Sequence, residues 1–238
     1  MNRLIVASLF LAALCAAASA QVSMTGTGLG APSTGGGGGG QSVWNSADKD
    51  TSITLSTTAV TNDTATQNGA GSSWRMVRGT QGYATGTANK KVFTLAMAAV
   101  DSTRGWLGGV ADASVALGSY VGSAAHAMGV QAAATVDYQD GVVQSPQVCS
   151  GSFAQGSTLW IAIDFNTGNL WCSADCTTWL GSGTPNPDSG TNPAYALTSA
   201  TYFPAWSGDD NTGSDVAVLN TRPTLGGCSN ITTFSQWG

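Results

Sequence analysis

From Val43 onward, short apolar or alternating segments are separated by turn residues. Residues 53–56 alternate apolar and polar positions, and residues 159–165 form the most continuously apolar segment. The other strand candidates are residues 91–97, 106–110, 128–138, 170–172, 202–206 and 215–219. Beyond the N-terminal region the chain has no sustained 3.6-residue periodicity, and only residues 123–128 have the composition of a helical turn. Many short strands with closely spaced turns predict an all-β protein, either a sandwich or a barrel.

The N-terminal region has the pattern of a signal peptide. Arg3 supplies a positive charge, residues 4–14 are apolar, and residues 18–20 (Ala-Ser-Ala) are small, as a signal peptidase requires at its cleavage point. The apolar run is shorter than the roughly 20 residues that a membrane-spanning helix needs. We therefore expect residues 1–20 to be removed after Ala20 and the protein to be exported. No second apolar stretch is long enough to span a membrane.

Glycine dominates the next segment. Residues 35–40 are all glycine, and residues 26–30 alternate glycine with other residues. A stretch with so few side chains to bury predicts a flexible linker at residues 21–42. The strand pattern then predicts one domain at residues 43–222, followed by a C-terminal tail at 223–238.

The charge balance limits the classes of partner. The chain has 8 Lys and Arg against 13 Asp and Glu, a formal net charge of −5, and only 9% charged residues. The sequence contains no basic patch, so nucleic acid is not an expected partner. The net acidity also disfavours binding to an anionic membrane surface.

Cleavage after Ala20 would leave four of the five cysteines, namely Cys149, Cys172, Cys176 and Cys228. An even number in an exported chain predicts two disulfides, and four cysteines allow three pairings. Residues 173–175 have the composition of a hairpin tip, and strand residues that flank a tight turn can lie within bridging distance. We therefore expect the pairs Cys172–Cys176 and Cys149–Cys228, the second of which would tie the tail back to the domain.

Three parts of the sequence resemble motifs of SPRY domains, which are relatives of the concanavalin A-like fold. Residues 106–117 (WLGGVADASVAL) resemble the strand of that family that ends in G-V-A-x-A-S. Residues 159–180 resemble its I-G-V-A-x-D-x-x-x-G-x-L-x-F hairpin, although Cys172 replaces the usual aromatic residue. Residues 202–207 (YFPAWS) are similar to its Y-P-A-x-S strand. The resemblance covers residues 43–222, is nearest to bacterial and phage members, and implies a two-sheet antiparallel β-sandwich.

The resemblance also implies where a ligand would bind. SPRY domains generally bind through loops at one end of the sandwich, and one such loop follows the Y-P-A-x-S strand. The matching positions are Gly208, Asp209, Asp210 and Asn211. The loop around Tyr120 is the second candidate, because an exposed aromatic ring can stack on a sugar or anchor a peptide.

The tryptophans have a different expected role. Trp160, Trp171 and Trp179 lie in or beside strand patterns, where packing in the core or between sheets is expected. Trp44 and Trp237 lie at the edges of the domain, and the pattern does not place them.

Catalysis is not expected. The polysaccharide hydrolases of the concanavalin A-like fold use paired glutamates, and this chain contains no glutamate. Asp48 and Asp50 are close in sequence but lie on no β pattern. The chain has no Gly-x-Ser-x-Gly motif, and its only histidine, His126, has no evident partner for nucleophilic catalysis. A metal site at Cys172 and Cys176 would lack further ligands, and no cofactor is expected.

A calcium site is an alternative for the loop after residue 208. Asp209, Asn211 and Asp215 place oxygen ligands at intervals that suit a hard cation. The loop lacks the bidentate glutamate of an EF-hand, and its Asp, Asn and Gly residues are also those of an ordinary solvated turn.

The sequence therefore predicts an exported, non-catalytic binding module that recognises a protein or a glycan. A structural component of a cell surface or virion is the alternative, for which an exposed apolar patch or edge-strand pairing would be the sign. A polysaccharide-active enzyme is the third possibility.

Overall fold

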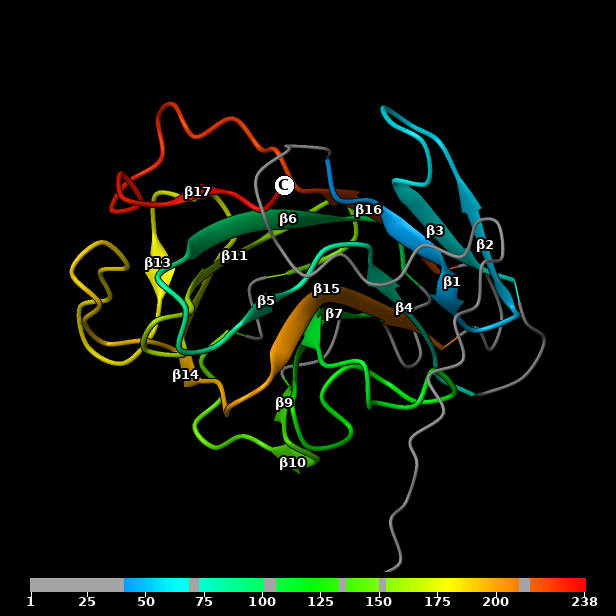
Figure 1. Ribbon diagram of the computed structural model, residues 1–238, viewed down its shortest axis with the longest axis horizontal. Helices are drawn as coiled ribbons and strands as arrows, with labels where there is room; N and C mark the ends of the chain where they lie inside the picture. The colour runs from blue at the N-terminus through cyan, green and yellow to red at the C-terminus, as the bar shows by residue number, and fades with distance from the viewer. Residues whose placement is uncertain (1–40, 69–72, 101–105, 133–135, 150–152, 210–214) are drawn as a thin grey trace, which may run out of the picture. The chain divides into compact units, whose positions relative to one another are not determined.

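The computed structural model describes residues 41–68, 73–100, 106–132, 136–149, 153–209 and 215–238 (Figure 1). The chain divides into Met1–Ala31 and Pro32–Gly238, and all described residues belong to the second unit. The predicted signal peptide and residues 21–40 of the predicted linker lie outside the described residues.

The described residues form a two-sheet β-sandwich, which confirms the predicted fold class. Sheet A has eight strands, with seven in the hydrogen-bonded order β1-β4-β15-β7-β8-β9-β10 and β5 beside β15. Their bounds are β1 (Trp44–Lys49), β4 (Arg75–Gly79), β5 (Tyr83–Ala84), β7 (Trp106–Ala111), β8 (Ala127–Gln131), β9 (Asp137–Gln139), β10 (Val142–Val143) and β15 (Thr201–Gly208). All the strand pairs of sheet A are antiparallel.

Sheet B has nine strands, with seven in the order β13-β12-β11-β6-β16-β3-β2. Their bounds are β2 (Ile53–Ser56), β3 (Thr64–Gln67), β6 (Lys90–Ala99), β11 (Thr158–Asp164), β12 (Asn169–Ser173), β13 (Trp179–Leu180) and β16 (Asp215–Asn220). The two remaining strands are β14 (Tyr195–Ala196), which pairs with β12, and β17 (Ser235–Gln236), which pairs with β6 in parallel.

No helix is present in the part of the chain that the structure describes. Residues 123–128, which have the composition of a helical turn, instead form bends and turns that lead into β8. The described residues accordingly offer no helix long and apolar enough to cross a membrane. The sequence also missed β1, on which Asp48 lies, because its residues are mostly polar and partly exposed.

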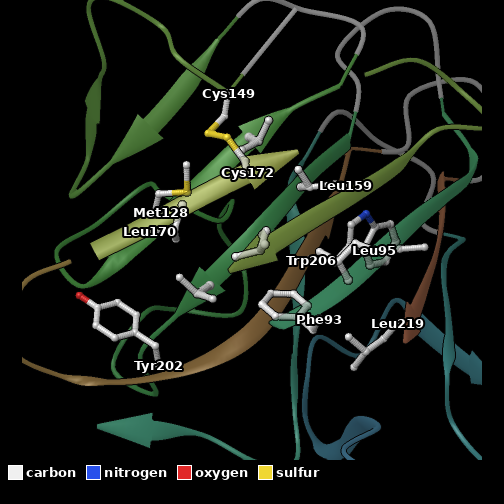
Figure 2. Close-up of a cluster of buried hydrophobic side chains, with 14 of the residues drawn as sticks. Phe93, Leu95, Met128, Cys149, Leu159, Leu170, Cys172, Tyr202, Trp206 and Leu219 are labelled. Carbon is white, nitrogen blue, oxygen red and sulfur yellow. A yellow bond between two sulfur atoms is a disulfide. The ribbon is translucent and has the colours of Figure 1, made fainter. Parts of the chain in front are cut away.

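The core fills the space between the two sheets. On β6, the alternate residues Phe93, Leu95 and Met97 are fully buried and face sheet A. Figure 2 shows two of them beside Trp206 of β15 and Leu159 of β11. This two-residue alternation is the one that the sequence pattern predicts for strands with one face in a core.

The cysteines form two disulfides, but with pairings that correct the sequence prediction. Cys149 bonds to Cys172, and Cys176 bonds to Cys228, with Cα–Cα distances of 5.9 and 5.0 Å. Cys172 faces the core between the sheets, as Figure 2 shows, whereas Cys176 packs in a separate cluster on the outer face of sheet B. Cys172 and Cys176 cannot pair because they lie on opposite faces of the sheet.

The C-terminal segment 223–238 covers part of the outer face of sheet B. Ile231 and Phe234 pack on Val92, Trp171 and Trp179 there. β16 pairs with the second half of β6, and β17 pairs with Lys91 and Val92 near the start of β6 (Figure 1). Trp171 and Trp179 are therefore buried beneath the segment, outside the main core, and Trp160, also expected to be buried, is partly exposed on the same face.

Asp188 holds this segment in place. Its carboxylate accepts hydrogen bonds from the backbone N–H and hydroxyl of Thr232, at 2.9 and 2.9 Å, and of Thr233, at 2.8 and 2.7 Å. Burial raises the pKa of Asp188, but the hydrogen bonds from Thr233 and Thr232 together outweigh burial and leave the pKa below its ordinary value of 3.8.

A lowered folded-state pKa makes the contribution of Asp188 pH-dependent. Stability from this carboxylate is fully present above pH 3.8 and is lost as pH falls through the lower folded-state value. We expect Asp188→Asn to lower the free energy of unfolding at pH 7, and this difference from the wild type to shrink below pH 4. Urea unfolding at pH 7, 5 and 3 measures the difference. A difference that is the same at all three pH values would contradict the assigned role of the ionised carboxylate.

Candidate functional site

The loop at residues 112–126, between β7 and β8, covers much of the outer face of sheet A. The buried residues of this layer are Met76, Leu107, Ala111, Val115, Val121, Ala127 and Ala205. Val115 and Val121 come from the loop, and the others come from the strands beneath it. The loop therefore has its own small apolar cluster, separate from the core between the sheets.

Two close contacts hold the loop down around Tyr120. The backbone N–H of Val121 donates a hydrogen bond of 3.1 Å to the hydroxyl of Ser207 on β15. A Cβ atom at Gly129 would collide with the backbone oxygen of Val121, so only glycine lets the loop approach β8 this closely. The position of Tyr120 is thus fixed by its neighbour in sequence.

Arg78 on β4 anchors the first part of the loop. Its side chain is 3% exposed and forms two hydrogen bonds of 2.7 Å with the carboxylate of Asp48. It also donates to the backbone oxygens of Asp112, Ala113 and Val115. A planar guanidinium has five N–H donors, so one residue can hold a carboxylate and several carbonyls together.

Tyr120 lies between two other partly buried aromatic residues. Its ring centroid is 5.7 Å from that of Trp74 and 4.9 Å from that of Tyr138, with tilted and edge-on geometries. Burial raises the pKa of Tyr138, and the neighbouring Tyr120 raises it further, so this phenol stays protonated at neutral pH. The three rings form an aromatic surface that also carries two phenol hydroxyls and an indole N–H.

The surface continues to the edge of the sheet. Val143 of β10 is opposite Tyr138 in the antiparallel register, so the two side chains share one face. Val142 and Val143 are 61% and 50% exposed and are the large exposed hydrophobic residues of the described chain. We call the group Trp74, Leu117, Tyr120, Tyr138 and Val143 the Tyr120 patch.

One positive charge borders the Tyr120 patch. Arg75 follows Trp74 and is one-third exposed, with its Nε 3.5 Å from a carboxylate oxygen of Asp50. In the strand register Arg75 is opposite Gly208, so the patch begins next to the end of β15. The structure thus brings the two loops proposed from the sequence close together, since Val121 also bonds to Ser207.

The residues proposed after β15 have a different environment from Tyr120. Gly208 is buried, and Asp209 is 0% exposed, with its N–H donating a hydrogen bond of 2.9 Å to the carboxylate of Asp215. Asp210 and Asn211 lie outside the described residues. Of the proposed ligand-binding residues that the structure describes, Tyr120 is therefore the one with an accessible side chain.

The calcium alternative involves the same loop. Asp209 and Asp215 are joined by the hydrogen bond just described, and Asn211 lies outside the described residues. Among the residues that the structure does describe, no three His, Cys, Asp or Glu side chains gather as metal ligands would. The calcium site stays a prediction.

His126 occupies another position on the loop. Its Nδ1 lies 2.9 Å from the hydroxyl of Thr198, and its backbone N–H donates to the carboxylate of Asp140. The Thr198 hydroxyl in turn lies 3.1 Å from that of Tyr202. These contacts join the end of the loop to the segment that leads into β15.

Sequence reasoning missed Trp74, Arg75 and Tyr138. Trp74 precedes β4 and Arg75 is its first residue, and the apolar pattern did not reveal this strand. The sequence pattern places Tyr138 in a strand candidate, residues 128–138, but the neighbouring residues do not indicate which face of the sheet its side chain occupies. The turn Asp140-Gly141, with φ of 52° and 83°, is the one local signal that fixes β9 against β10 and so places Val143 beside Tyr138.

The sandwich is similar to solved SPRY domains. The SPRY domain of human HERC1 has a TM-score of 0.54 at 13% identity, over 74% of this chain and 96% of that one. The PSpry domain of TRIM65 has a TM-score of 0.51 at 15% identity, over 75% of this chain and 91% of that one. No family model and no curated protein matches the sequence. At these identities the likeness establishes the fold, which is the SPRY-type sandwich expected from the sequence motifs.

Proposed function

We propose that this SPRY-type sandwich is an exported, non-catalytic module that binds its ligand through the Tyr120 patch. The carrying observation is the row of partly exposed rings at Trp74, Tyr120 and Tyr138. Tyr120 lies on a loop that is held by Arg78 and Ser207, whereas Trp74 directly precedes β4 and Tyr138 lies on β9, so the surface is formed before a ligand arrives. A preformed surface saves the entropy of ordering side chains on binding.

A protein is the favoured ligand over a glycan for this patch. Trp, Tyr and Arg are the residue types that dominate the binding energy of protein interfaces, and the patch combines two of them with Arg75 at its border. The exposed Val143, which shares a face with Tyr138, extends the surface with aliphatic area. Export is supported by the two disulfides, which persist in oxidising compartments.

The test compares binding by the wild type with binding by matched variants. The immobilised protein is exposed to a cell-envelope protein extract and, in parallel, to a glycan array. We expect Tyr120→Ala and Trp74→Ala each to weaken binding of the captured protein by about tenfold or more, the scale of an interface hot spot. Trp160→Ala, on the outer face of sheet B, is the control and is expected to leave this binding unchanged.

The possible outcomes separate the alternatives. Binding that Tyr120→Ala and Trp74→Ala leave intact would contradict the proposal. If Asp210→Ala with Asn211→Ala removed it instead, the site would belong to the loop after β15. A glycan signal lost in Tyr120→Ala would keep the site and replace the protein ligand by a glycan.

Assembly with further copies of the chain is the second candidate, and one observation favours it. β10 is the edge strand of sheet A in the described chain, and its two valines are exposed. Such an edge can pair with a strand of another chain. If the protein elutes as an oligomer and Val142→Lys with Val143→Lys makes it a monomer, the assembly function replaces the binding module. A monomer in both cases leaves the binding proposal in place.

A further inference from the structure

The outer face of sheet B is divided between a covered half and an open half. The C-terminal segment covers Trp171 and Trp179, as described above. Beside that cover, a groove of about 390 Å³ runs over the outward side chains of β6, β11 and β16. This volume is in the range of sites for small ligands, which is roughly 300–1,000 Å³.

The floor of the groove is a rigid grid of strand residues. Asn220, Thr94 and Trp160 are direct cross-strand neighbours, on β16, β6 and β11. The next row is Val218, Ala96 and Thr158 on the same three strands. These strands lie in the middle of sheet B, so their backbone groups are already paired with one another.

The polar groups of the groove are neutral, and they range from the 4% exposed Thr94 to the exposed Asn220. In the part of the chain that the structure describes, no hydrogen bond uses the indole N–H of Trp160, the hydroxyls of Thr94 and Thr158, or the side-chain N–H₂ of Asn220. Trp160 is partly exposed, so part of its indole is open to a ligand. The lining residues carry no charge.

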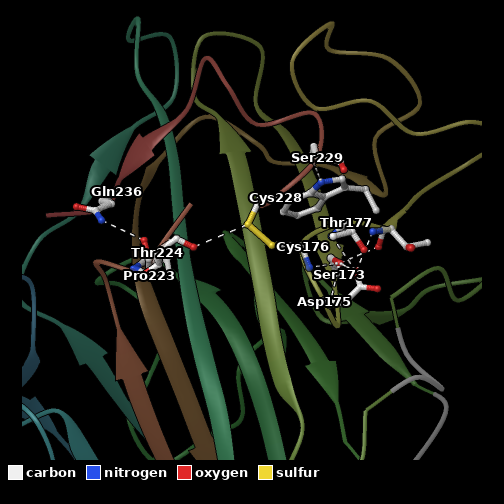
Figure 3. Close-up of a disulfide and its surroundings, with 11 residues drawn as sticks. Ser173, Asp175, Cys176, Thr177, Pro223, Thr224, Cys228, Ser229 and Gln236 are labelled. Atoms are coloured by element: carbon white, nitrogen blue, oxygen red, sulfur yellow. Dashed lines mark hydrogen bonds between the residues drawn. A yellow bond between two sulfur atoms is a disulfide. The ribbon is translucent and has the colours of Figure 1, made fainter. Parts of the chain in front are cut away.

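One wall of the groove is held by the C-terminal segment. Pro223 and Thr224 form this wall. The side chain of Gln236 donates a hydrogen bond of 3.0 Å to the backbone oxygen of Pro223, and the sulfur of Cys228 lies 3.9 Å from the backbone oxygen of Thr224 (Figure 3). Cys228 is bonded to Cys176, which follows the end of β12 in sheet B. This disulfide fixes the C-terminal segment, and with it Pro223 and Thr224, relative to the strands that form the floor of the groove.

We infer that this groove is a second binding site, separate from the Tyr120 patch, and that its ligand is a neutral saccharide chain. An aromatic ring beside unpaired hydroxyl and amide groups matches a sugar, which has apolar C–H faces and neutral hydroxyls around them. An acidic saccharide would find no cation in the lining. A peptide that adds as a strand needs a free sheet edge, and the central strands of sheet B offer none.

The experiment follows the indole N–H signal of Trp160 by NMR, assigned by its absence in Trp160→Phe. The probes are hexasaccharides of β-1,4-glucose, β-1,4-xylose, α-1,4-glucose and β-1,4-N-acetylglucosamine, with hexagalacturonate as the acidic control. We expect at least one neutral hexasaccharide to shift this signal saturably and the acidic one not to shift it. Because the Trp160 variants lack the signal, their binding is measured by isothermal titration calorimetry. Trp160→Ala is expected to weaken that binding by about tenfold or more, and Trp160→Phe by less, since it keeps a stacking ring.

Two further variants make the test independent of folding and of the Tyr120 patch. Thr94→Val with Thr158→Val removes two hydroxyls while it keeps the side-chain shape, and is expected to weaken binding severalfold. Tyr120→Ala is expected to leave saccharide binding unchanged. The inference is overturned if no neutral hexasaccharide shifts the Trp160 signal at millimolar concentration. It is also overturned if only a proline-rich peptide, which needs no strand pairing, shifts it.

Discussion

Trp237→Ala is expected to lower the free energy of unfolding by about 3–5 kcal/mol, the cost of deleting a large aromatic side chain from a core. Trp237 is 0% exposed, although it is the penultimate residue of the chain. Its ring lies edge-on to those of Phe93, Tyr83 and Phe165, with centroids 4.8, 5.2 and 5.5 Å away. Its indole N–H also donates a hydrogen bond of 2.9 Å to the backbone oxygen of Gln81, which the substitution would leave unpaired.

Urea unfolding followed by circular dichroism measures this effect. Trp237→Phe should lose less, because a smaller ring still fills part of the site. Trp160→Ala removes the same side chain from a partly exposed position and should cost about 1.5 kcal/mol or less, in line with incomplete burial. A loss below about 1 kcal/mol for Trp237→Ala would show that the C-terminal segment is not part of the core.

Arg78→Met is expected to lower the free energy of unfolding by about 3 kcal/mol, because it removes a buried guanidinium that pairs with the partly exposed carboxylate of Asp48. The Asp48 carboxylate would lose both 2.7 Å hydrogen bonds, and three loop carbonyls would lose their donor. Arg78→Lys keeps the charge but not the planar fork, so it should restore only part of this stability. The same variants should weaken ligand binding at the Tyr120 patch, since the loop that carries Tyr120 is held by these bonds.

Arg75→Met is the matched control for Arg78. Arg75 is three residues earlier on the same strand, but it is one-third exposed and its contact with Asp50 is 3.5 Å long. Exposed pairs of this kind contribute about 0–1 kcal/mol. Equal losses of stability in the two variants would contradict the anchoring role of Arg78. Unfolding in urea gives both values, and binding at the Tyr120 patch is measured on Arg78→Lys under conditions where it remains folded.

The two proposed sites lie on opposite outer faces of the sandwich. The Tyr120 patch rests on sheet A, and the saccharide groove rests on sheet B. A protein with both sites would link a protein partner to a neutral glycan. Tyr120→Ala and Trp160→Ala separate the two activities, since each variant alters one face and serves as the control for the other.

The strands with the strongest apolar signal were found from the sequence. Residues 91–97, 106–110 and 159–165 all lie in or overlap strands β6, β7 and β11, because a short apolar run bounded by turn residues is a local property of the chain. The turn at Asp140-Gly141 is also a local feature, since its positive φ angles favour those residue types. Short polar strands such as β1 were missed, because backbone pairing with β4 forms them and their side chains carry little apolar signal.

The sequence by itself determined the all-β class, the presence of two disulfides and the candidacy of Tyr120. Only the tertiary structure decided which cysteines pair, because Cys172 faces the core and Cys176 packs on the outer face of sheet B. Only the tertiary structure placed Trp74 and Tyr138 beside Tyr120, left Trp160 open and buried Trp237 against Phe93. These contacts join residues far apart in the chain, and a local pattern of apolar and polar positions records the burial of a side chain but not the identity of its distant neighbours.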